Sequence, residues 1–529
     1  MDRRPPRDEE YRPLLERLYL ELDPPSLRDN TADLDRLVKG LRRRGIDPVD
    51  VHPSSIGPLR ERILQGDFKV TAVLARTGPK WELVDVLPGR EEGPLWGLAL
   101  DLGTSRLAFY LLDLRAGEVA ETASVPNPQI PWGEDILARI LHARREDLRR
   151  ELGEMLARAV NRTAGEMVRR RGGSLDRVYA FSVAGNTTMT HFFLGLDPSR
   201  ICREPYIPVA NRFPFFHARD LALDLHPRAP VYVFPNVGSY FGGDLVAGIL
   251  ATGMQRREEV SMLVDVGTNA EVVLGNRDWL LACAGAAGPA LEGGVVERGM
   301  MAAPGAVDRV RVDPETLELS YRVLGGGKPR GLCGSGLIDL VAELFAAGVL
   351  TVQGRIDLRA PTDRVRETPD GPAFLVAPAE ETADGRDLLV SQIDIGILLK
   401  SKAAMYTILS VITRKVGMEI RDVSRIFVAG TFGNRIDPAM AVRMGMLPDL
   451  PLETYQGMGN TAGEGAVMIL RDRSLLEDVQ RICDRITYVE LNVNMELMNE
   501  FRGALFLPHT DPGLFPSVAV PRRALGKED

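Results

Sequence analysis

The stretch Asp101-Leu102-Gly103-Thr104-Ser105 (DLGTS) decides the fold, because it lies between two apolar runs at residues 95–100 and 107–112. Each run has the composition of a buried strand, so the turn between them is predicted to be the tip of a β-hairpin. Gly103 lets the backbone approach a ligand, and Thr104 and Ser105 add hydroxyls beside exposed N–H groups. Asp101 could hold a hydrated divalent cation. The turn could therefore cradle a phosphate with its metal, although similar turns occur in hairpins that bind nothing.

The same pattern recurs at residues 262–275, MLVDVGTNAEVVLG. A strand again ends in an aspartate, Asp265, which is followed by Val266-Gly267-Thr268-Asn269 and then by an alternating strand. This repetition strengthens the interpretation of both turns as phosphate-binding elements.

Length and composition limit the class of protein. A chain of 529 residues is long enough for two or more domains with sizeable cores. The net charge is −8, and the basic clusters at 42–44 and 169–171 lack interleaved aromatic residues, which favours solvated helix ends over nucleic-acid binding. We found no apolar stretch that approaches the length of a membrane span and no signal peptide, so we expect a cytoplasmic protein without a membrane partner.

The four cysteines are far apart and form no CxxC pair. Their spacing supports neither a zinc site nor an iron–sulfur cluster, and it makes a disulfide framework improbable.

The pattern along the chain predicts three domains. Residues 1–92 form a small α+β domain, in which apolar positions at helical spacing predict a first helix over 10–22. Residues 93–258 and 259–529 form two larger α/β domains, each beginning with one of the two hairpins. Within the last domain, residues 351–387 are polar and are predicted to be peripheral.

Two further strand-to-helix junctions are candidates for a site. Asp244 follows two glycines at a helix start, where it either caps the helix or orients an attacking water. Gly430-Thr431-Phe432-Gly433 follows another strand; the glycines would let an adenosine lie against the backbone, and Phe432 either stacks on the base or belongs to the core.

The order of these elements resembles the ATPase superfamily of acetate and sugar kinases, heat-shock chaperones and actin. The resemblance implies two ribonuclease-H-like domains, preceded here by the small α+β linker domain, that bind Mg-ATP in the cleft between them. It implies that the turns at 101–105 and 267–269 grip the phosphates and that residues 429–433 hold the adenosine. Asp101 and Asp265 would then hold the hydrated Mg²⁺, and Asp244 would orient the hydrolytic water.

Longer stretches resemble the reductive activators of corrinoid enzymes, and this resemblance covers nearly all of residues 19–518. These stretches are YLELDPPSLRDNTADLDRL (19–37), NPQIPWGEDILARI (127–140), AGNTTMTHFFLG (184–195), AGPALEGGVVERGM (287–300), GLCGSGLID (331–339) and LPHTDPGLFPSV (507–518). The resemblance implies an ATPase that couples nucleotide binding and hydrolysis to the one-electron reduction of a corrinoid protein from Co(II) to Co(I).

The chain departs from that family in one respect. Family members usually carry an iron–sulfur unit, commonly in an N-terminal ferredoxin-like domain, whereas Cys202, Cys283, Cys333 and Cys483 offer no replacement. We therefore expect no cluster in this chain and an external ferredoxin-like electron donor. A homodimer with a shared cluster, a small-molecule kinase and a nucleotide-responsive binding protein without a redox role remain as alternatives.

Overall fold

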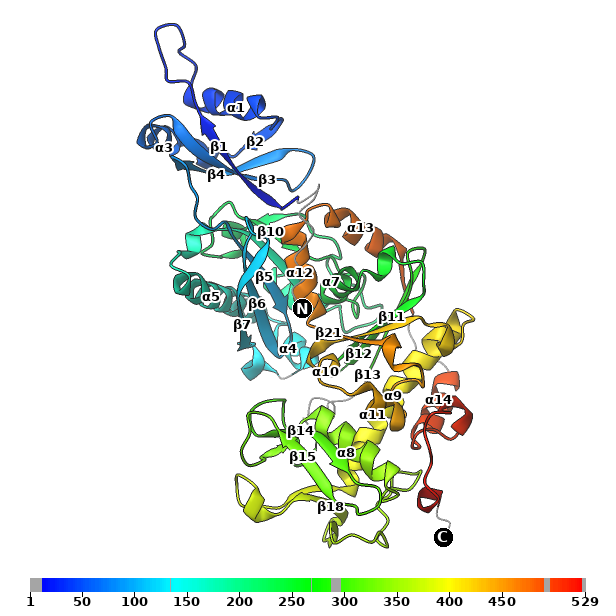
Figure 1. Ribbon diagram of the computed structural model, residues 1–529. Coiled ribbons are helices and arrows are strands. Elements are labelled where there is room, and N and C mark those ends of the chain that lie inside the picture. Colours follow the sequence, from blue (N-terminus) through cyan, green and yellow to red (C-terminus); the bar gives the residue numbers. More distant parts are fainter. Residues whose placement is uncertain (1–11, 134, 268, 287–295, 490–494, 526–529) are drawn as a thin grey trace. The chain divides into compact units, whose positions relative to one another are not determined.

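The computed structural model describes residues 12–133, 135–267, 269–286, 296–489 and 495–525 (Figure 1). The chain packs into two compact units. Unit 1 comprises Met1–Ala251 and Thr461–Asp484, and unit 2 comprises Thr252–Asn460 and Arg485–Asp529.

The linker domain at the start of unit 1 is a four-stranded sheet covered by short helices (Figure 1). Its strands, in the spatial order β1-β3-β4-β2, are β1 (Leu15–Glu21), β3 (Lys69–Ala75), β4 (Trp81–Pro88) and β2 (Val49–Val51). Its helices are α1 (Asp33–Arg43), α2 (Pro53–Ile56) and α3 (Leu59–Gln65). Leu37 and Leu41 of α1 and Ile63 of α3 pack in one apolar core with the sheet.

The prediction of a helix over residues 10–22 was wrong, because residues 15–21 form the strand β1. Leu15 and Leu20 are buried, and the strand pairs antiparallel with β3 from Leu15 opposite Ala75 to Glu21 opposite Lys69. The pairing with β3 outweighs the helical spacing of the leucines, which is a local signal.

The larger domain of unit 1 has the sheet order β7-β6-β5-β8-β10-β9. The strands are β5 (Trp96–Leu102), β6 (Arg106–Asp113), β7 (Glu118–Pro126), β8 (Val178–Gly185), β9 (Phe216–His217) and β10 (Pro230–Val233). The helices are α4 (Ile136–His142), α5 (Glu146–Arg170), α6 (Thr187–Phe193) and α7 (Gly243–Thr252). The β5–β6 hairpin is antiparallel and pairs Leu102 with Leu107, so the predicted hairpin is present. β5, β8 and β10 run parallel to one another.

Two later helices complete unit 1. α12 (Thr461–Arg471) packs against β5 and β8, and α13 (Leu475–Arg485) follows it. A Cβ atom at Gly465 would collide with the backbone carbonyl of Ala247 in α7, so the glycine permits the close approach of α12 to α7.

Unit 2 repeats the same topology. Its main sheet has the order β21-β20-β11-β12-β13-β22, in which β11 pairs antiparallel with β12 and parallel with β20. The strands are β11 (Ser261–Val266), β12 (Asn269–Gly275), β13 (Leu280–Ala286), β20 (Arg425–Ala429), β21 (Tyr455–Gly459) and β22 (Ile486–Tyr488). When the edge strands β9 and β22 are left out and the other five strands of each sheet are numbered in chain order, both sheets have the spatial arrangement third-second-first-fourth-fifth. This agreement confirms the predicted pair of ribonuclease-H-like folds.

Unit 2 also contains two three-stranded sheets. One has the order β15-β14-β16, with β14 (Ala306–Val312), β15 (Leu319–Val323) and β16 (Gly331–Leu332), and α8 (Gly334–Ala346) packs against β14. The other has the order β17-β18-β19, with β17 (Val365–Thr368), β18 (Gly371–Ala377) and β19 (Leu388–Ser391). Phe374 and Val376 are buried in the core of unit 2, so the prediction that residues 351–387 are peripheral was wrong for this strand.

The remaining helices of unit 2 are α9 (Gln392–Lys415), α10 (Gly430–Gly433), α11 (Pro438–Arg443) and α14 (Met495–Ala504). Contrary to the sequence analysis, α9 has the length and hydropathy of a membrane span, but most of it is buried within unit 2. Lys402 of α9 is fully buried and donates from Nζ to the carbonyls of Gly445, Phe506 and Pro508 at 3.3, 2.7 and 2.6 Å. α9 is therefore a core helix that anchors the C-terminal stretch.

Candidate functional site

The candidate residues of unit 1 follow three parallel strands. Asp101 near the end of β5 lies opposite Ala184 of β8, and Val183 of β8 lies opposite Val233 of β10. Since the carboxyl ends of parallel strands meet at one edge of a sheet, the segments after β5, β8 and β10 come together there.

Two asparagines fix the turn after β5. Asn127 donates from Nδ2 to the carbonyl of Gly103 at 2.8 Å, and its backbone N–H donates to the carbonyl of Ser105 at 2.9 Å. Asn186, the N-cap of α6, donates from Nδ2 to Thr104 Oγ1 at 3.0 Å. The turn is therefore held by residues that follow β7 and β8.

Arg139 of α4 binds the same turn and was not singled out in the sequence analysis. Its Nη2 donates to the carbonyl of Thr104 at 2.8 Å. In a trans peptide the N–H points away from the carbonyl. The carbonyls of Gly103 and Thr104 face Asn127 and Arg139, so the N–H groups of the next residues face the opposite side. Successive N–H groups of this kind suit an anion such as phosphate.

Tyr110 and Glu464 are two polar neighbours of Asp101 that sequence reasoning also missed. Burial raises the pKa of Tyr110 to about 12, with further contributions from the nearby carboxylates of Asp101 and Glu464. A Cβ at Gly463 would collide with the ring of Tyr110, so α12 lies directly against β6 at this point. No local signal marks these residues, because α12 follows β6 by about 350 positions in the chain.

Asp244 occupies the second position of α7, which begins at Gly243. Its Oδ1 accepts from the N–H of Leu245 at 2.9 Å, and the N–H of Gly243 donates to Asn236 Oδ1 at 3.1 Å. Gly242 packs against Asn186 so closely that a Cβ would collide with it. Asp244 thus lies on the segment after β10, which adjoins the segment after β8. Its carboxylate supports the first turn of α7 and is also a candidate to orient water.

In unit 2, Asp265 lies opposite Ala429, the last residue of β20. A Cβ at Gly430, whose φ is +80°, would lie 3.4 Å from Asp265 Oδ1. Burial raises the pKa of Asp265 to about 6, and a hydrogen bond from the N–H of Val266 partly opposes this shift. The two candidate segments of unit 2 therefore meet at the ends of β11 and β20.

The segment predicted to bind adenosine forms the short helix α10. Gly433 packs against the carbonyl of Val428, and a Cβ at Gly457 would lie 2.5 Å from the carbonyl of Gly433, so both glycines permit close packing with β20 and β21. The described residues end at Gly267 and resume at residue 269. Thr268 lies outside the described residues, and the side chains of Asn269, Thr431 and Phe432 are likewise not described.

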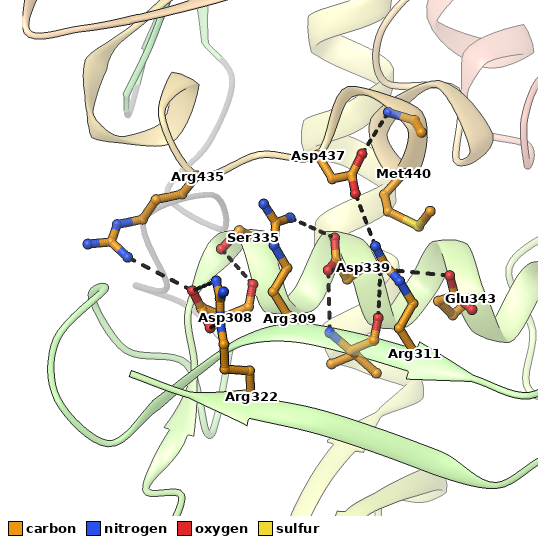
Figure 2. A network of polar contacts seen from close by, with 12 residues as sticks. Asp308, Arg309, Arg311, Arg322, Ser335, Asp339, Glu343, Arg435, Asp437 and Met440 are labelled. Carbon is orange, nitrogen blue, oxygen red and sulfur yellow. Dashed lines mark hydrogen bonds and ion pairs between the residues drawn. The ribbon is translucent and has the colours of Figure 1, made fainter. Parts of the chain in front are cut away.

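A network of ion pairs fixes the chain after α10 to α8 and β14 (Figure 2). Arg311 donates from Nη1 to Asp339 Oδ2 at 3.3 Å and from Nη2 to Asp437 Oδ2 at 3.1 Å. Asp437 in turn caps α11 by accepting from the N–H of Ala439 at 3.1 Å. Asp308 lies between Arg322 and Arg435 (Figure 2), with its carboxylate 2.6 Å from the former and 4.0 Å from the latter.

Asp339 is fully buried in this network. Burial raises its pKa to about 6, although Arg309 and Arg311 oppose the shift. The network therefore holds the segment that follows the candidate adenosine loop in a defined position.

Two of the four cysteines lie in environments that disfavour the thiolate form. Burial raises the pKa of Cys483 to about 12 and that of Cys283 further, whereas cluster and zinc ligands are thiolates. Cys333 lies at the N-cap of α8, and its Sγ donates to the carbonyl of Val307 at 3.4 Å. Within the described ranges, no group of three or more His, Cys, Asp or Glu side chains is arranged to hold a metal ion.

The paired sheets, each with an aspartate near the end of its first strand, define an ATPase fold of the actin-like class. Three family descriptions match the chain in succession: the RACo linker region at residues 6–93, the RACo middle region at 96–257 and the C-terminal ASKHA domain of RACo at 259–519. The chain belongs to the RACo family, the reductive activators of corrinoid proteins, as its sequence motifs predicted.

The individual proteins to which the chain is similar agree with this family assignment. The chain is 30% identical over 435 residues to "Corrinoid activation enzyme RamQ" of Eubacterium limosum, covering 79% of this chain and 72% of that protein. It is 25% identical over 446 residues to "[Co(II) methylated amine-specific corrinoid protein] reductase" of Methanosarcina barkeri, covering 77% and 76%. A solved structure, "Reductive activator for corrinoid,iron-sulfur protein", superimposes with a TM-score of 0.88 at 35% identity, covering 97% of this chain and 82% of that one.

Proposed function

We propose that this chain is a cytoplasmic ATPase that reductively activates a corrinoid protein. One electron from an external ferredoxin-like donor reduces Co(II) of the partner to Co(I), the donor is oxidised by one electron, and ATP with water gives ADP and phosphate. The observation that supports this proposal most strongly is the 35% identity to a reductive activator over 97% of this chain. The aspartates near the ends of β5 and β11 support it further.

The candidate residues of each unit, taken by themselves, have the chemistry to bind part of a magnesium nucleotide. Asp101 and Asp265 supply oxygen ligands, and Mg²⁺ usually needs only one or two carboxylates besides phosphates and water. The ion would neutralise phosphate charge when bound. Gly103, Thr104 and Ser105 would bind phosphate through N–H and hydroxyl groups, and Gly267, Thr268 and Asn269 would do the same from unit 2. Residues 430–433 would hold the adenosine, and Asp244 would orient the hydrolytic water.

The test is an anaerobic assay of the full chain with a Co(II) corrinoid protein, a reduced ferredoxin and Mg-ATP. We expect the Co(II) absorbance to be lost only when all components are present, and we expect the corrinoid protein to stimulate phosphate release. Asp101→Asn should lower both rates by about 100-fold or more, since it removes a metal ligand. The exposed Asp50→Asn, which removes only a surface pair with Lys80, is the control.

Three other outcomes would contradict the proposal. ATP hydrolysis that ignores every corrinoid protein offered would contradict the redox role. A phosphorylated metabolite detected by phosphorus NMR would indicate a kinase, and nucleotide binding without turnover would indicate a binding protein. Light scattering of the full chain would determine whether it forms the homodimer kept as an alternative.

A further inference from the structure

Arg139 is a buried cation behind the candidate phosphate turn. Its side chain is fully buried, although a guanidinium group is costly to remove from water. Nε donates to the carbonyl of Gly133 at 2.7 Å, Nη2 donates to the carbonyl of Thr104 at 2.8 Å, and Nη1 contacts Met189 Sδ at 3.5 Å.

These acceptors do not neutralise the charge. Two are backbone carbonyls and one is a thioether, and no carboxylate of the described residues forms an ion pair with Arg139. Asp135, the N-cap of α4, acts on it only at longer range. Burial lowers the pKa of Arg139 to about 10, so the group stays charged at neutral pH. The other buried arginines differ: Arg228 pairs with Glu82 and Arg36 pairs with Asp29.

The hydrogen bond to Thr104 places the positive charge of Arg139 against one particular peptide group of the turn. Arg139 binds the carbonyl of the peptide whose N–H belongs to Ser105, and that N–H faces away from the arginine. The guanidinium polarises this peptide, because hydrogen bonds in series strengthen one another in a medium of low dielectric. An anion at the far side of the turn would therefore experience both the polarised N–H and the positive charge of Arg139.

We propose that Arg139 is a positioning residue that orients the turn at 103–105 and makes it favour ligands with more phosphate groups. This inference rests on the proposed ATP binding, which it extends by naming the source of discrimination between nucleoside polyphosphates and monophosphates.

The experiment measures dissociation constants of the full chain for Mg-ATP, ADP and AMP by titration calorimetry. Arg139→Gln keeps a donor for the carbonyls but removes the charge, whereas Arg139→Lys keeps the charge. We expect Arg139→Gln to weaken ATP binding about tenfold and AMP binding no more than about twofold, since charge-assisted hydrogen bonds are about twice as strong as neutral ones. Arg139→Lys should retain most of the preference for ATP, and if the glutamine chain does not fold, a lysine variant that binds ATP and AMP equally well would overturn the inference.

The control is Arg36→Gln, which removes a buried arginine of the linker domain and should leave the ratio of ATP to AMP affinity unchanged. Equal losses for all three nucleotides in Arg139→Gln, or no loss in that variant, would overturn the inference while ATP binding by the wild-type chain stood. A wild-type chain that binds no ATP would overturn the inference together with the proposed function.

Discussion

Asp265 shows at the scale of a single residue how a candidate site can reduce stability. Its pKa is raised from 3.8 to about 6, so the folded chain retains this proton over a pH range in which the unfolded chain has lost it. The free energy of unfolding therefore falls as the pH rises from about 4 to about 6 and stays lower above that. Asp265→Asn should raise the free energy of unfolding by up to about 3 kcal/mol at pH 7 while abolishing ATP hydrolysis.

Denaturant unfolding at several pH values, without nucleotide or Mg²⁺, checks this prediction. The gain of the variant over the wild type should close as the pH falls towards 4. Asp278→Asn, which changes an exposed aspartate of the same unit, should show no such dependence. A variant less stable than the wild type at pH 8 would show that burial does not strain this carboxylate.

Two helical glycines offer a prediction at the scale of elements. Gly465→Ala places a methyl group against the carbonyl of Ala247, so α12 and α7 must move apart, which should cost about 1–3 kcal/mol. Gly396 lies in α9 with open space around it, and Gly396→Ala should instead stabilise the chain by up to about 1 kcal/mol. Thermal unfolding of both variants gives the comparison. Equal shifts of the same sign in the two variants would mean that the lack of a Cβ atom at Gly465 does not determine how closely α12 packs against α7.

Some elements could be predicted from sequence patterns, and others could not. The hairpins and strand-end aspartates were predictable, because an apolar run, an aspartate and a glycine turn are adjacent in the chain. β1 was not, because its leucines follow helical spacing and only its pairing with β3, more than 45 residues later, selects a strand. Arg139 was missed for the same reason, since its contact with Thr104 spans 35 residues. Contacts between distant segments leave no local pattern.

At the scale of the whole molecule, the chain leaves unit 1 after residue 251 and returns to it at residue 461. The returning α12 buries Val467, Ile469 and Leu470 within unit 1, where it packs against β5 and β8. Burying three such side chains contributes about 5–9 kcal/mol, which is comparable to the total stability of a domain. A fragment that ends at residue 258, the predicted domain boundary, should therefore not unfold cooperatively, although it contains the complete sheet.

The fragment should regain a cooperative transition when residues 461–484 are attached through a flexible linker, because the attached segment restores the buried face of α12. Circular dichroism during heating and binding of a hydrophobic dye distinguish the two fragments: the shorter one should bind the dye and lack a sharp transition. A version of the longer fragment with Val467→Asp and Leu470→Asp is the matched control, since it keeps the length but not the apolar contacts. A cooperative transition in the shorter fragment would mean that unit 1 folds without the segment that the chain returns to it.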